Sequence, residues 1–223
     1  MAAIYDCSDP AELMTGSRLA RAALGRGELV VIPTDTVYGV AADAFAPAAV
    51  QRLLEAKGRG RRSPPPVLIP GIPTLDALAE TVPDAVRALV AEFWPGGLTV
   101  ILPARESLDW DLGETHGTVA LRMPADRVAL ELLSETGPLA VSSANTTGAP
   151  AAMTALEALG MLGEAVAVYL DNGPAGRGYT AEGRDSGSTI VDATALVSGG
   201  EPRIVRRGVI PEEDILAVIG RPS

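Results

Sequence analysis

Cysteine, histidine and lysine each occur only once in the 223 residues, which limits the chemistry that the side chains can perform. Cys7 has no second cysteine for an intrachain disulfide and no nearby histidine for a metal site, so we interpret it as an incidental thiol. His116 lies in the stretch GETHGT, where a solvated loop side chain is expected. A Ser-His-Asp or Cys-His mechanism would have to use this one histidine, so general acid–base chemistry by histidine is disfavoured.

Long apolar runs are also missing, although 47% of the residues are hydrophobic. No uninterrupted run reaches the roughly 18 residues that a membrane-spanning helix needs. The first ten residues contain Asp6 and Asp9 and lack the basic and apolar regions of a signal peptide. We therefore expect a cytoplasmic protein with no membrane segment and with enough apolar residues for a buried core.

The common nucleotide-binding and metal-binding motifs are absent as well. The sequence contains no G-x-x-x-x-G-K-[ST] and no G-x-G-x-x-G that opens a helix after a strand, which excludes a P-loop and a dinucleotide-binding fingerprint. It contains neither HExxH nor CxxC, and we predict no metal site made by the protein's own side chains.

Acidic residues outnumber basic residues, 28 to 18, and the formal net charge is −10. A chain of this charge is not expected to offer a broad nucleic-acid-binding surface. Lys57 is the only lysine in an arginine-rich sequence, which hints at a position that needs a compact ammonium. The cations form a main cluster and a smaller one, at Lys57, Arg59, Arg61 and Arg62 and at Arg203, Arg206 and Arg207. The main cluster is either a polyphosphate site or a solvated basic loop.

Apolar periodicity and turn residues predict alternating helices and strands. We expect helices at residues 10–24, 47–56, 74–79, 83–93, 126–136, 155–162 and 211–219. We expect strands at residues 28–33, 67–69, 98–102, 118–123, 139–142, 165–170, 188–192 and 203–206. Residues 171–186 are rich in glycine and charge and predict a mobile surface loop. The irregular spacing of the elements favours one α/β domain with a mixed sheet over a doubly wound parallel sheet.

The segment PTDTVYG, residues 33–39, directly follows an apolar strand. Because side chains alternate in an extended chain, Thr34 and Thr36 are expected on one face and Asp35 on the other. Two hydroxyls at the mouth of a strand can hydrogen-bond a small polar ligand. An ordinary strand end with a preference for threonine is the alternative.

The segment TVALRMP, residues 118–124, places Thr118, Ala120 and Arg122 on one face of an apolar strand. A buried arginine needs an anionic partner, and a carboxylate held through two N–H groups is the natural candidate. If the strand instead lies at the exposed edge of a sheet, Arg122 needs no such partner.

Small polar residues also mark two later strands, with SSAN at 142–145 and GSTIVD at 187–192. Ligands of open α/β sheets commonly bind at the carboxyl ends of strands, where SSAN would lie. Ser142 or Ser143 could act as a nucleophile, but no base is evident nearby. Each of these two segments is a weak signal alone.

Taken together and in this order, seven segments resemble the YrdC-type threonylcarbamoyl-AMP synthases. The resemblance covers about residues 15–220 of what we expect to be a single domain, residues 1–223. The matching segments are PTDTVYG (33–39), the K-x-R of Lys57 and Arg59, FWPGGLTVIL (93–102), TVALRMP (118–124), SSAN-x-x-G-x-P (142–150), GSTIVD (187–192) and Arg206-Arg207-Gly208.

The resemblance implies an α/β fold with an open, strongly twisted, mixed sheet flanked by helices, and a deep cationic cavity. It implies that the chain joins L-threonine and bicarbonate to a carbamate, which attacks the α-phosphorus of ATP with loss of pyrophosphate. Such a reaction needs positioning and charge neutralisation rather than a side-chain nucleophile. Mg²⁺ would be held mainly by the ATP phosphates and water. A downstream tRNA threonylcarbamoyl-transferase complex would use the product to modify the adenosine next to the anticodon, and the chain itself could contact RNA weakly.

The resemblance also implies roles for individual residues. Lys57 and Arg59 are the expected catalytic residues, as ligands of the ATP phosphates. The threonine site is expected to use Thr36, Arg122, Ser188 and Thr189. The rest of the nucleotide site is expected to use Ser63, Thr118, Ser143, Asn145 and Arg206.

The sequence departs from the family pattern after the K-x-R. The family usually has a histidine near the substrate there, and Leu68 takes its place, with the extra Arg61 and Arg62 available on the phosphate side. The additional C-terminal domain of longer relatives is expected to be absent. Two alternatives remain open. One is an RNA-binding module of the same fold without catalysis, and the other is a hydrolase that uses Ser142 or Ser143.

Overall fold

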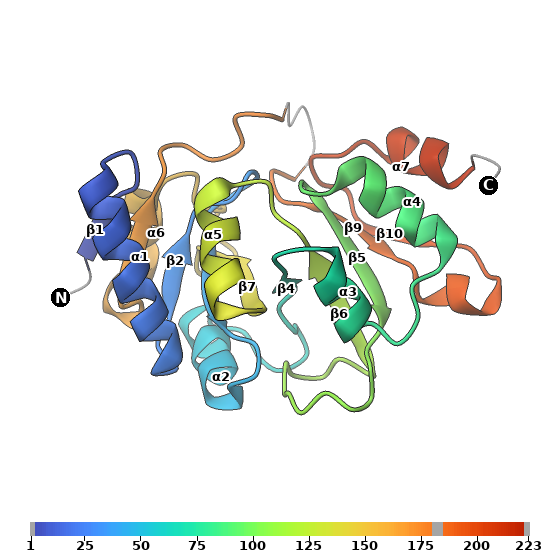
Figure 1. Ribbon diagram of the computed structural model, residues 1–223, viewed down its shortest axis with the longest axis horizontal. Coiled ribbons are helices and arrows are strands. Elements are labelled where there is room, and N and C mark those ends of the chain that lie inside the picture. The colour runs from blue at the N-terminus through green and yellow to red at the C-terminus, as the bar shows by residue number, and fades with distance from the viewer. Residues whose placement is uncertain (1–2, 180–184, 221–223) are drawn as a thin grey trace.

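Ten strands form one mixed sheet in the computed structural model, which describes residues 3–179 and 185–220 (Figure 1). Their order across the sheet is β1-β8-β2-β3-β7-β4-β6-β5-β9-β10. Four of the nine neighbouring pairs are parallel and five are antiparallel. The strands are β1 (Ala3–Asp6), β2 (Val30–Ile32), β3 (Gly39–Asp43), β4 (Val67–Leu68), β5 (Leu98–Pro103), β6 (Thr118–Arg122), β7 (Leu139–Ser143), β8 (Val168–Asp171), β9 (Thr189–Asp192) and β10 (Arg203–Arg206).

Helices connect most of these strands and begin where the sequence supplies caps. The Asp9 carboxylate accepts the backbone N–H groups of Ala11 and Glu12 at the start of α1, and Pro10 is its first residue. The helices are α1 (Pro10–Gly25), α2 (Pro47–Ala56), α3 (Ile72–Leu78), α4 (Asp84–Phe93), α5 (Arg127–Thr136), α6 (Ala155–Leu162) and α7 (Glu212–Ile219), with short 3₁₀ helices η1 (Gly163–Ala165) and η2 (Thr194–Ser198).

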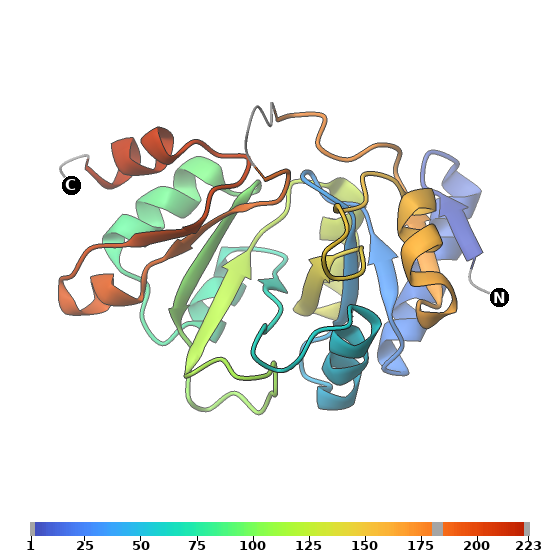
Figure 2. The ribbon, with the colours of Figure 1, turned by 180° about the vertical axis from the view of Figure 1, so that it is seen from behind.

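The first half of the sheet, β1-β8-β2-β3-β7, has helices on both faces (Figures 1 and 2). In β2, Val30 and Ile32 belong to the core that contains α1 and α5. Val31, on the other face, belongs to the core that contains α2 and α6. This arrangement explains why β2 is a continuous apolar run rather than an alternating one.

In the described part of the chain, helices cover one face of the second half, β6-β5-β9-β10, and β4 joins the two halves. Leu98, Val100 and Leu102 of β5 pack in a core with α3, α4 and α7. The alternate residues Thr99 and Ile101 point to the other face, where no described helix lies over β5 and β6 (Figure 2). That open face is accessible to a ligand.

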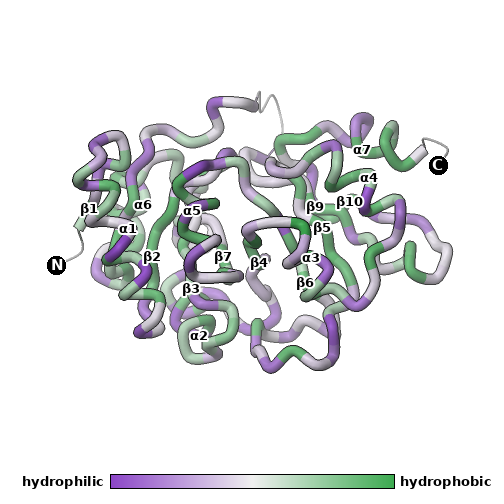
Figure 3. Tube along the Cα trace, in the orientation of Figure 1, coloured by the Kyte–Doolittle hydropathy of each residue, from purple (hydrophilic) through white to green (hydrophobic). Residues whose placement is uncertain are grey.

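Hydropathy follows this layering. Apolar residues run along strands such as β2 and β5, and hydrophilic residues gather in the surface loops (Figure 3). The largest fully buried side chains nevertheless include Tyr38, Tyr169 and Lys57, whose polar atoms need hydrogen-bond partners. Within residues 3–179 and 185–220, no helix is long and apolar enough to cross a membrane.

The predicted helices and strands are confirmed to within a few residues, and so is the mixed sheet of an α/β domain. Two strands were not predicted, β1 and β3. The sequence of β3, GVAAD, has a single β-branched residue, so its composition does not favour a strand. Its pairing with β2 and β7 fixes it instead. Part of the predicted mobile loop 171–186, residues 180–184, lies outside the described residues, so its mobility stays a prediction.

The alternation expected for Thr34, Asp35 and Thr36 is only partly confirmed. The Thr34 and Thr36 hydroxyls lie 3.2 Å apart, as expected, but Asp35 bonds the same Arg122 side chain as Thr36. Residues 33–37 form the turn between β2 and β3. The Thr34 hydroxyl oxygen accepts the backbone N–H groups of Thr36 and Val37, each at 3.2 Å. Such local side-chain bonds compete with strand pairing, and here they direct the Asp35 side chain towards Arg122.

Candidate functional site

A cavity of about 940 Å³ lies on the open face of the second half of the sheet. Its walls combine the β2–β3 turn, the loop after α2, strands β5 and β6, the end of β7 with its following loop, and residues 185–188 with Ile190. The volume falls within the range of roughly 300–1,000 Å³ that small-molecule sites occupy. Among the described lining residues, cations outnumber anions, with Arg59, Arg122 and Arg206 against Asp185.

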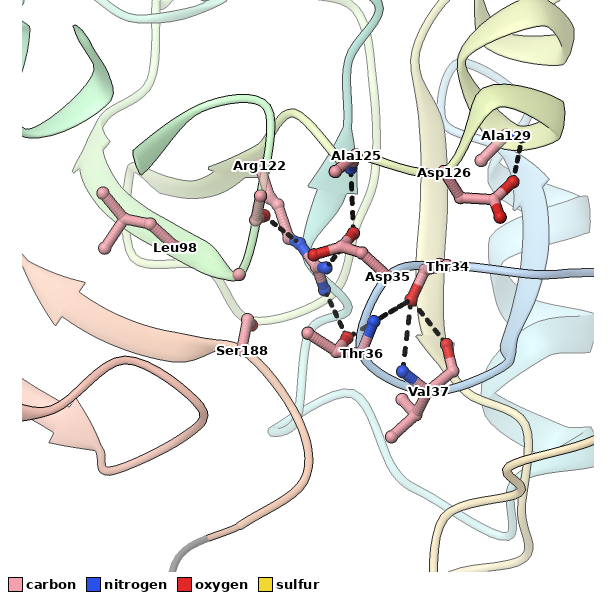
Figure 4. Close-up of polar contacts among 12 residues, drawn as sticks. Thr34, Asp35, Thr36, Val37, Leu98, Arg122, Ala125, Asp126, Ala129 and Ser188 are labelled. Atoms are coloured by element: carbon pink, nitrogen blue, oxygen red, sulfur yellow. Dashed lines mark hydrogen bonds and ion pairs between the residues drawn. The ribbon is translucent and has the colours of Figure 1, made fainter. Parts of the chain in front are cut away.

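The first polar group at the cavity is the arginine cluster, which we define as Arg122, Asp35 and Thr36 (Figure 4). Arg122 and Thr36 line the cavity, and Asp35 does not. Arg122 is only 6% exposed at the end of β6. Its Nη2 donates to Asp35 Oδ1 at 2.7 Å and its Nη1 donates to the Thr36 hydroxyl at 2.9 Å. Its Nε donates to the Gly96 carbonyl at 2.9 Å. These bonds use three of the five N–H groups of the guanidinium.

The buried arginine therefore has an anionic partner within the protein, as its burial requires. The Asp35 carboxylate also accepts the backbone N–H of Ala125 at 2.9 Å and the hydroxyl of Tyr179 at 3.1 Å. The positive charge of Arg122 is thus balanced by Asp35 before any ligand arrives. A substrate carboxylate would bind to the N–H groups of Arg122 that do not take part in these hydrogen bonds.

The second polar group is the lysine cluster, which we define as Lys57, Ser143 and Asn145. Lys57 follows the last residue of α2, and its side chain is 1% exposed. Its Nζ donates to the Asn145 carbonyl and to Asn145 Oδ1, both at 2.7 Å, and to the Ser143 carbonyl. Lys57 therefore fixes the end of β7 and the following loop, both of which line the cavity.

No carboxylate among the described residues pairs with Lys57 Nζ, whose partners are neutral oxygens. Burial of the ammonium, with a smaller contribution from the nearby Arg59 charge, lowers the pKa of Lys57 to about 7. The lysine cluster is therefore cationic without an internal counter-charge when Lys57 is protonated.

Lys57 Nζ also lies 3.3 Å from the Ser143 hydroxyl, and a serine–lysine hydrolase would use such a pair. To act as the general base, Lys57 Nζ would have to accept the proton of the Ser143 hydroxyl through a free lone pair. Instead, Nζ donates to three other oxygens, and the Ser143 hydroxyl donates to Asn145 Oδ1 at 2.6 Å. His116 is exposed in a turn and does not line the cavity. The geometry does not support a serine nucleophile.

A third group joins β5, β9 and β10. The Ser188 and Thr99 hydroxyls lie 2.7 Å apart and share a hydrogen bond. Arg206 donates through Nε to the Ser188 carbonyl and through Nη2 to its hydroxyl, both at 2.9 Å. Burial lowers the pKa of Arg206, and the nearby Arg122 and Arg59 charges act in the same direction. Two hydroxyls and an arginine are thus held in place at this side of the cavity.

Most of the candidate residues come together in this one cavity. Three do not line it: Lys57 lies behind the wall, Ser63 is exposed, and Thr189 is buried elsewhere. The Thr189 hydroxyl donates to the Ile210 carbonyl at 2.7 Å and accepts two backbone N–H groups, so it holds the chain before α7. Eight candidates line the cavity: Thr36, Arg59, Thr118, Arg122, Ser143, Asn145, Ser188 and Arg206.

The residues that depart from the family pattern, Leu68, Arg61 and Arg62, differ in their position relative to the cavity. Leu68 lines the cavity as expected, beside the apolar wall of Pro64, Pro65 and Pro66. Arg61 and Arg62 do not line it; they pair with Asp111 at 2.7 Å and with Glu114 at 3.8 Å. The structure therefore does not place the two extra arginines on the phosphate side.

The sequence did not predict that Asp35 is the partner of Arg122. It also gave no role at the site to three other polar residues, Thr99, Tyr179 and Asp185. Thr99 had a usable signal, because it alternates with the apolar residues of β5 within FWPGGLTVIL. Tyr179 had none, since its contact with Asp35 joins residues 144 positions apart.

Comparison with known proteins gives a consistent family. The family model Sua5_yciO_yrdC, described as "Telomere recombination", matches residues 22–208. A relative named "Putative threonylcarbamoyl-AMP synthase" from Mycobacterium leprae is 50% identical over 97% of this chain and 94% of the relative. The "Threonylcarbamoyl-AMP synthase" of Bacillus subtilis is 38% identical over 90% of this chain and 56% of the relative.

Solved structures agree with these matches. The crystal structure of P. abyssi Sua5 complexed with L-threonine superposes with a TM-score of 0.85 at 32% identity. The match covers 99% of this chain and 61% of that chain, so the present chain spans about three-fifths of its length. E. coli YciO, at 20% identity and a TM-score of 0.75, shows the fold alone.

Proposed function

The chain belongs to the Sua5/YciO/YrdC family, and on that premise we propose that it is an L-threonylcarbamoyladenylate synthase. It converts L-threonine, bicarbonate and ATP to threonylcarbamoyl-AMP and pyrophosphate. The observation that carries the proposal is one cavity served by two buried cations of different character. Arg122 lines the cavity and has an internal carboxylate partner, and Lys57 lies behind the wall and has neutral partners.

The amino acid binds at the arginine cluster. Threonine brings one carboxylate, and Arg122 and the Thr36 hydroxyl offer it a cation and a hydrogen-bonding group side by side. Ser188 lies on the same cavity and supplies a further hydroxyl. Because Asp35 already balances Arg122, this site suits a small zwitterion better than a polyanion.

The nucleotide binds towards the lysine cluster. Arg59 and Arg206 line the cavity and neutralise the triphosphate, while Thr118, Ser143 and Asn145 offer neutral hydrogen-bonding groups. Lys57 positions Ser143 and Asn145 through its hydrogen bonds. A direct contact of Lys57 with phosphate stays a prediction, and it requires the ammonium to exchange one of its oxygen partners for a phosphate oxygen.

The chemistry then needs no side-chain nucleophile. The threonine amine forms the C–N bond to the bicarbonate carbon with release of water, and the resulting carbamate oxygen attacks the α-phosphorus. The bond from that phosphorus to the pyrophosphate leaving group breaks in the same displacement. The side chains hold both reactants together and balance the charge that develops on the phosphates.

A Mg²⁺ ion bound with ATP would supply further charge neutralisation to the phosphates. Among the described residues no group of three or more His, Cys, Asp or Glu side chains could hold a metal ion. Among the described lining residues, the side-chain oxygens are hydroxyls, the amide oxygen of Asn145 and the carboxylate of Asp185, which fits an ion held mainly by phosphate oxygens and water.

The product is an activated carbamoyl group, which a tRNA threonylcarbamoyl-transferase complex transfers to the adenosine next to the anticodon. The enzyme works in the cytoplasm, and any RNA contact of its own is weak. The exposed Arg61, Arg203 and Arg207 each pair with a carboxylate, which counts against an RNA-binding module of this fold without catalysis.

The test is pyrophosphate release from ATP and Mg²⁺ with threonine and bicarbonate each present or omitted. The proposal predicts release only when both are present, together with a product whose mass is that of threonylcarbamoyl-AMP. Release that needs neither substrate, or tight RNA binding without release, contradicts it.

A further inference from the structure

The connection from β8 to β9 joins two strands that have six others between them in the sheet. Its described residues after β8 run from the first half of the sheet towards the second (Figures 1 and 2). Its described part packs on the arginine cluster. Gly176 has a φ of +75°, and a Cβ there would lie 3.2 Å from the Thr36 carbonyl oxygen and 2.8 Å from Met153. The Ala175 N–H donates to the Met153 carbonyl at 2.8 Å, which fixes the chain just before Gly176.

Tyr179 ends this described stretch and is half-buried against the second half of the sheet. Its hydroxyl donates to Asp35 Oδ2 at 3.1 Å and accepts the Gly97 N–H at 2.9 Å. Burial, with the Asp35 charge beside it, raises the pKa of Tyr179 to about 12, so the hydroxyl keeps its proton and remains a donor to Asp35.

These bonds close a ring. Arg122 bonds Asp35, Asp35 bonds Tyr179, and Tyr179 bonds the N–H of Gly97. The carbonyl of the adjacent Gly96 accepts from Nε of Arg122. A Cβ on Gly97 would lie 3.1 Å from the Tyr179 hydroxyl and 2.4 Å from Val209, so glycine is required for this approach. Asp35 in the β2–β3 turn and Gly97 just before β5 are thereby held at a fixed separation by one hydroxyl.

We propose that Tyr179 and Asp35 are positioning residues for the amino-acid substrate: the Tyr179 hydroxyl orients the Asp35 carboxylate, which orients the Arg122 guanidinium towards the cavity. Neither Tyr179 nor Asp35 lines the cavity, so both act through Arg122. This inference rests on the proposed function, since it assumes that Arg122 binds the threonine carboxylate.

Loss of the Tyr179 hydroxyl should affect the binding of threonine and not the binding of ATP. Removal of the hydroxyl loosens the arginine cluster and leaves Arg59, Ser143 and Asn145 untouched, because none of these contacts Tyr179 or Asp35. The threonine KM should therefore respond while the ATP KM does not. A purely structural role of Tyr179 would lower the amount of folded enzyme and change neither KM.

The experiment compares Tyr179→Phe with Tyr169→Phe, a buried tyrosine whose hydroxyl donates only to the Gly163 carbonyl, at 2.8 Å. In Tyr179→Phe we expect the threonine KM to rise roughly tenfold, because a hydrogen bond to a charged group is lost, with the ATP KM unchanged. Tyr169→Phe should leave both KM values unchanged. Equal shifts of both KM values in Tyr179→Phe, or no shift, would overturn the inference.

A second readout needs no substrate. In arginine-labelled protein, the Arg122 Nε proton should exchange with solvent faster in Tyr179→Phe than in the wild type, and Tyr169→Phe should match the wild type. Unchanged exchange overturns the inference even if the wild type is active. Failure of the wild-type enzyme to release pyrophosphate contradicts the proposed function instead, so the two failures are distinguishable.

Discussion

Arg122 and Lys57 are both buried cations at the same cavity, but their surroundings balance charge differently. Arg122 is paired with the carboxylate of Asp35, whose side chain is itself only 11% exposed. Lys57 is surrounded by the carbonyls of Ser143 and Asn145 and by the Asn145 side-chain oxygen. Among the described residues, a carboxylate neutralises Arg122, whereas only neutral oxygen atoms surround Lys57.

The difference matches the two kinds of substrate in the proposed reaction. A site with a balanced charge can hold a zwitterion such as threonine without attracting a polyphosphate. A site with an unbalanced charge favours polyphosphate, and Arg59 and Arg206 on the same cavity add to it. Variants that alter one cluster at a time distinguish these two surroundings.

Removal of Asp35 should produce the largest change in stability. Asp35→Ala leaves Arg122 buried without a counter-charge, so the free energy of unfolding should fall by about 3–5 kcal/mol in urea denaturation. The matched control, Asp76→Ala, breaks the half-exposed ion pair with Arg87 and should lower it by less than about 1 kcal/mol. A double variant, Asp35→Ala with Arg122→Met, should recover stability; simple addition of the two losses would contradict the charge argument.

Replacement of Lys57 should affect catalysis more selectively. Lys57→Met keeps most of the buried hydrocarbon but removes the hydrogen bonds that hold Ser143 and Asn145, so kcat/KM for ATP should fall roughly 10–100-fold. The control is Arg52→Met, a cation of the same helix that donates to the Gly27 carbonyl away from the cavity. Wild-type kcat/KM for ATP in Lys57→Met would remove Lys57 from the nucleotide site.

The pH dependence of stability should distinguish the two cations further. The folded state lowers the pKa of Lys57 from 10.5 to about 7, so between these values the unfolded chain binds more protons than the folded one. The free energy of unfolding of the wild type, relative to Lys57→Met, should therefore rise as the pH increases from 7 to 9. A relative stability that is flat or falls over this range contradicts an unbalanced buried ammonium.

The smallest effect is expected for Arg61→Ala. Arg61 pairs with Asp111 on the surface, with both side chains about half exposed, and does not line the cavity. The midpoint of urea denaturation should match that of the wild type, and pyrophosphate release should remain at the wild-type rate. A large loss of activity would show that the basic loop contacts the nucleotide directly.

The sequence predicted the helices and most strands because apolar periodicity and turn residues act locally. It did not predict β3, which depends on its neighbours in the sheet, or the turn at Thr34, where a hydroxyl competes with strand pairing. Both failures arise from contacts that composition does not encode.

For the candidate site, too, some features were predicted from the sequence and others were not. The residue types on the cavity were predicted from motifs, and eight of the eleven candidates line it. The pairing of Arg122 with Asp35 was not predicted, because alternation in an extended strand would have pointed Asp35 away from Thr36. The burial of Lys57 behind the cavity wall was not predicted either, because its neighbours in the sequence are arginines, which indicate an exposed basic loop.

The most direct test of the central claim is a crossed measurement of KM values in two matched variants, Arg122→Gln and Arg59→Gln. Both replace a cavity-lining arginine with the same neutral side chain. The account predicts that Arg122→Gln raises the threonine KM with little change in the ATP KM, and that Arg59→Gln does the reverse. If both variants raise the same KM, the two clusters do not bind different substrates and the account is contradicted.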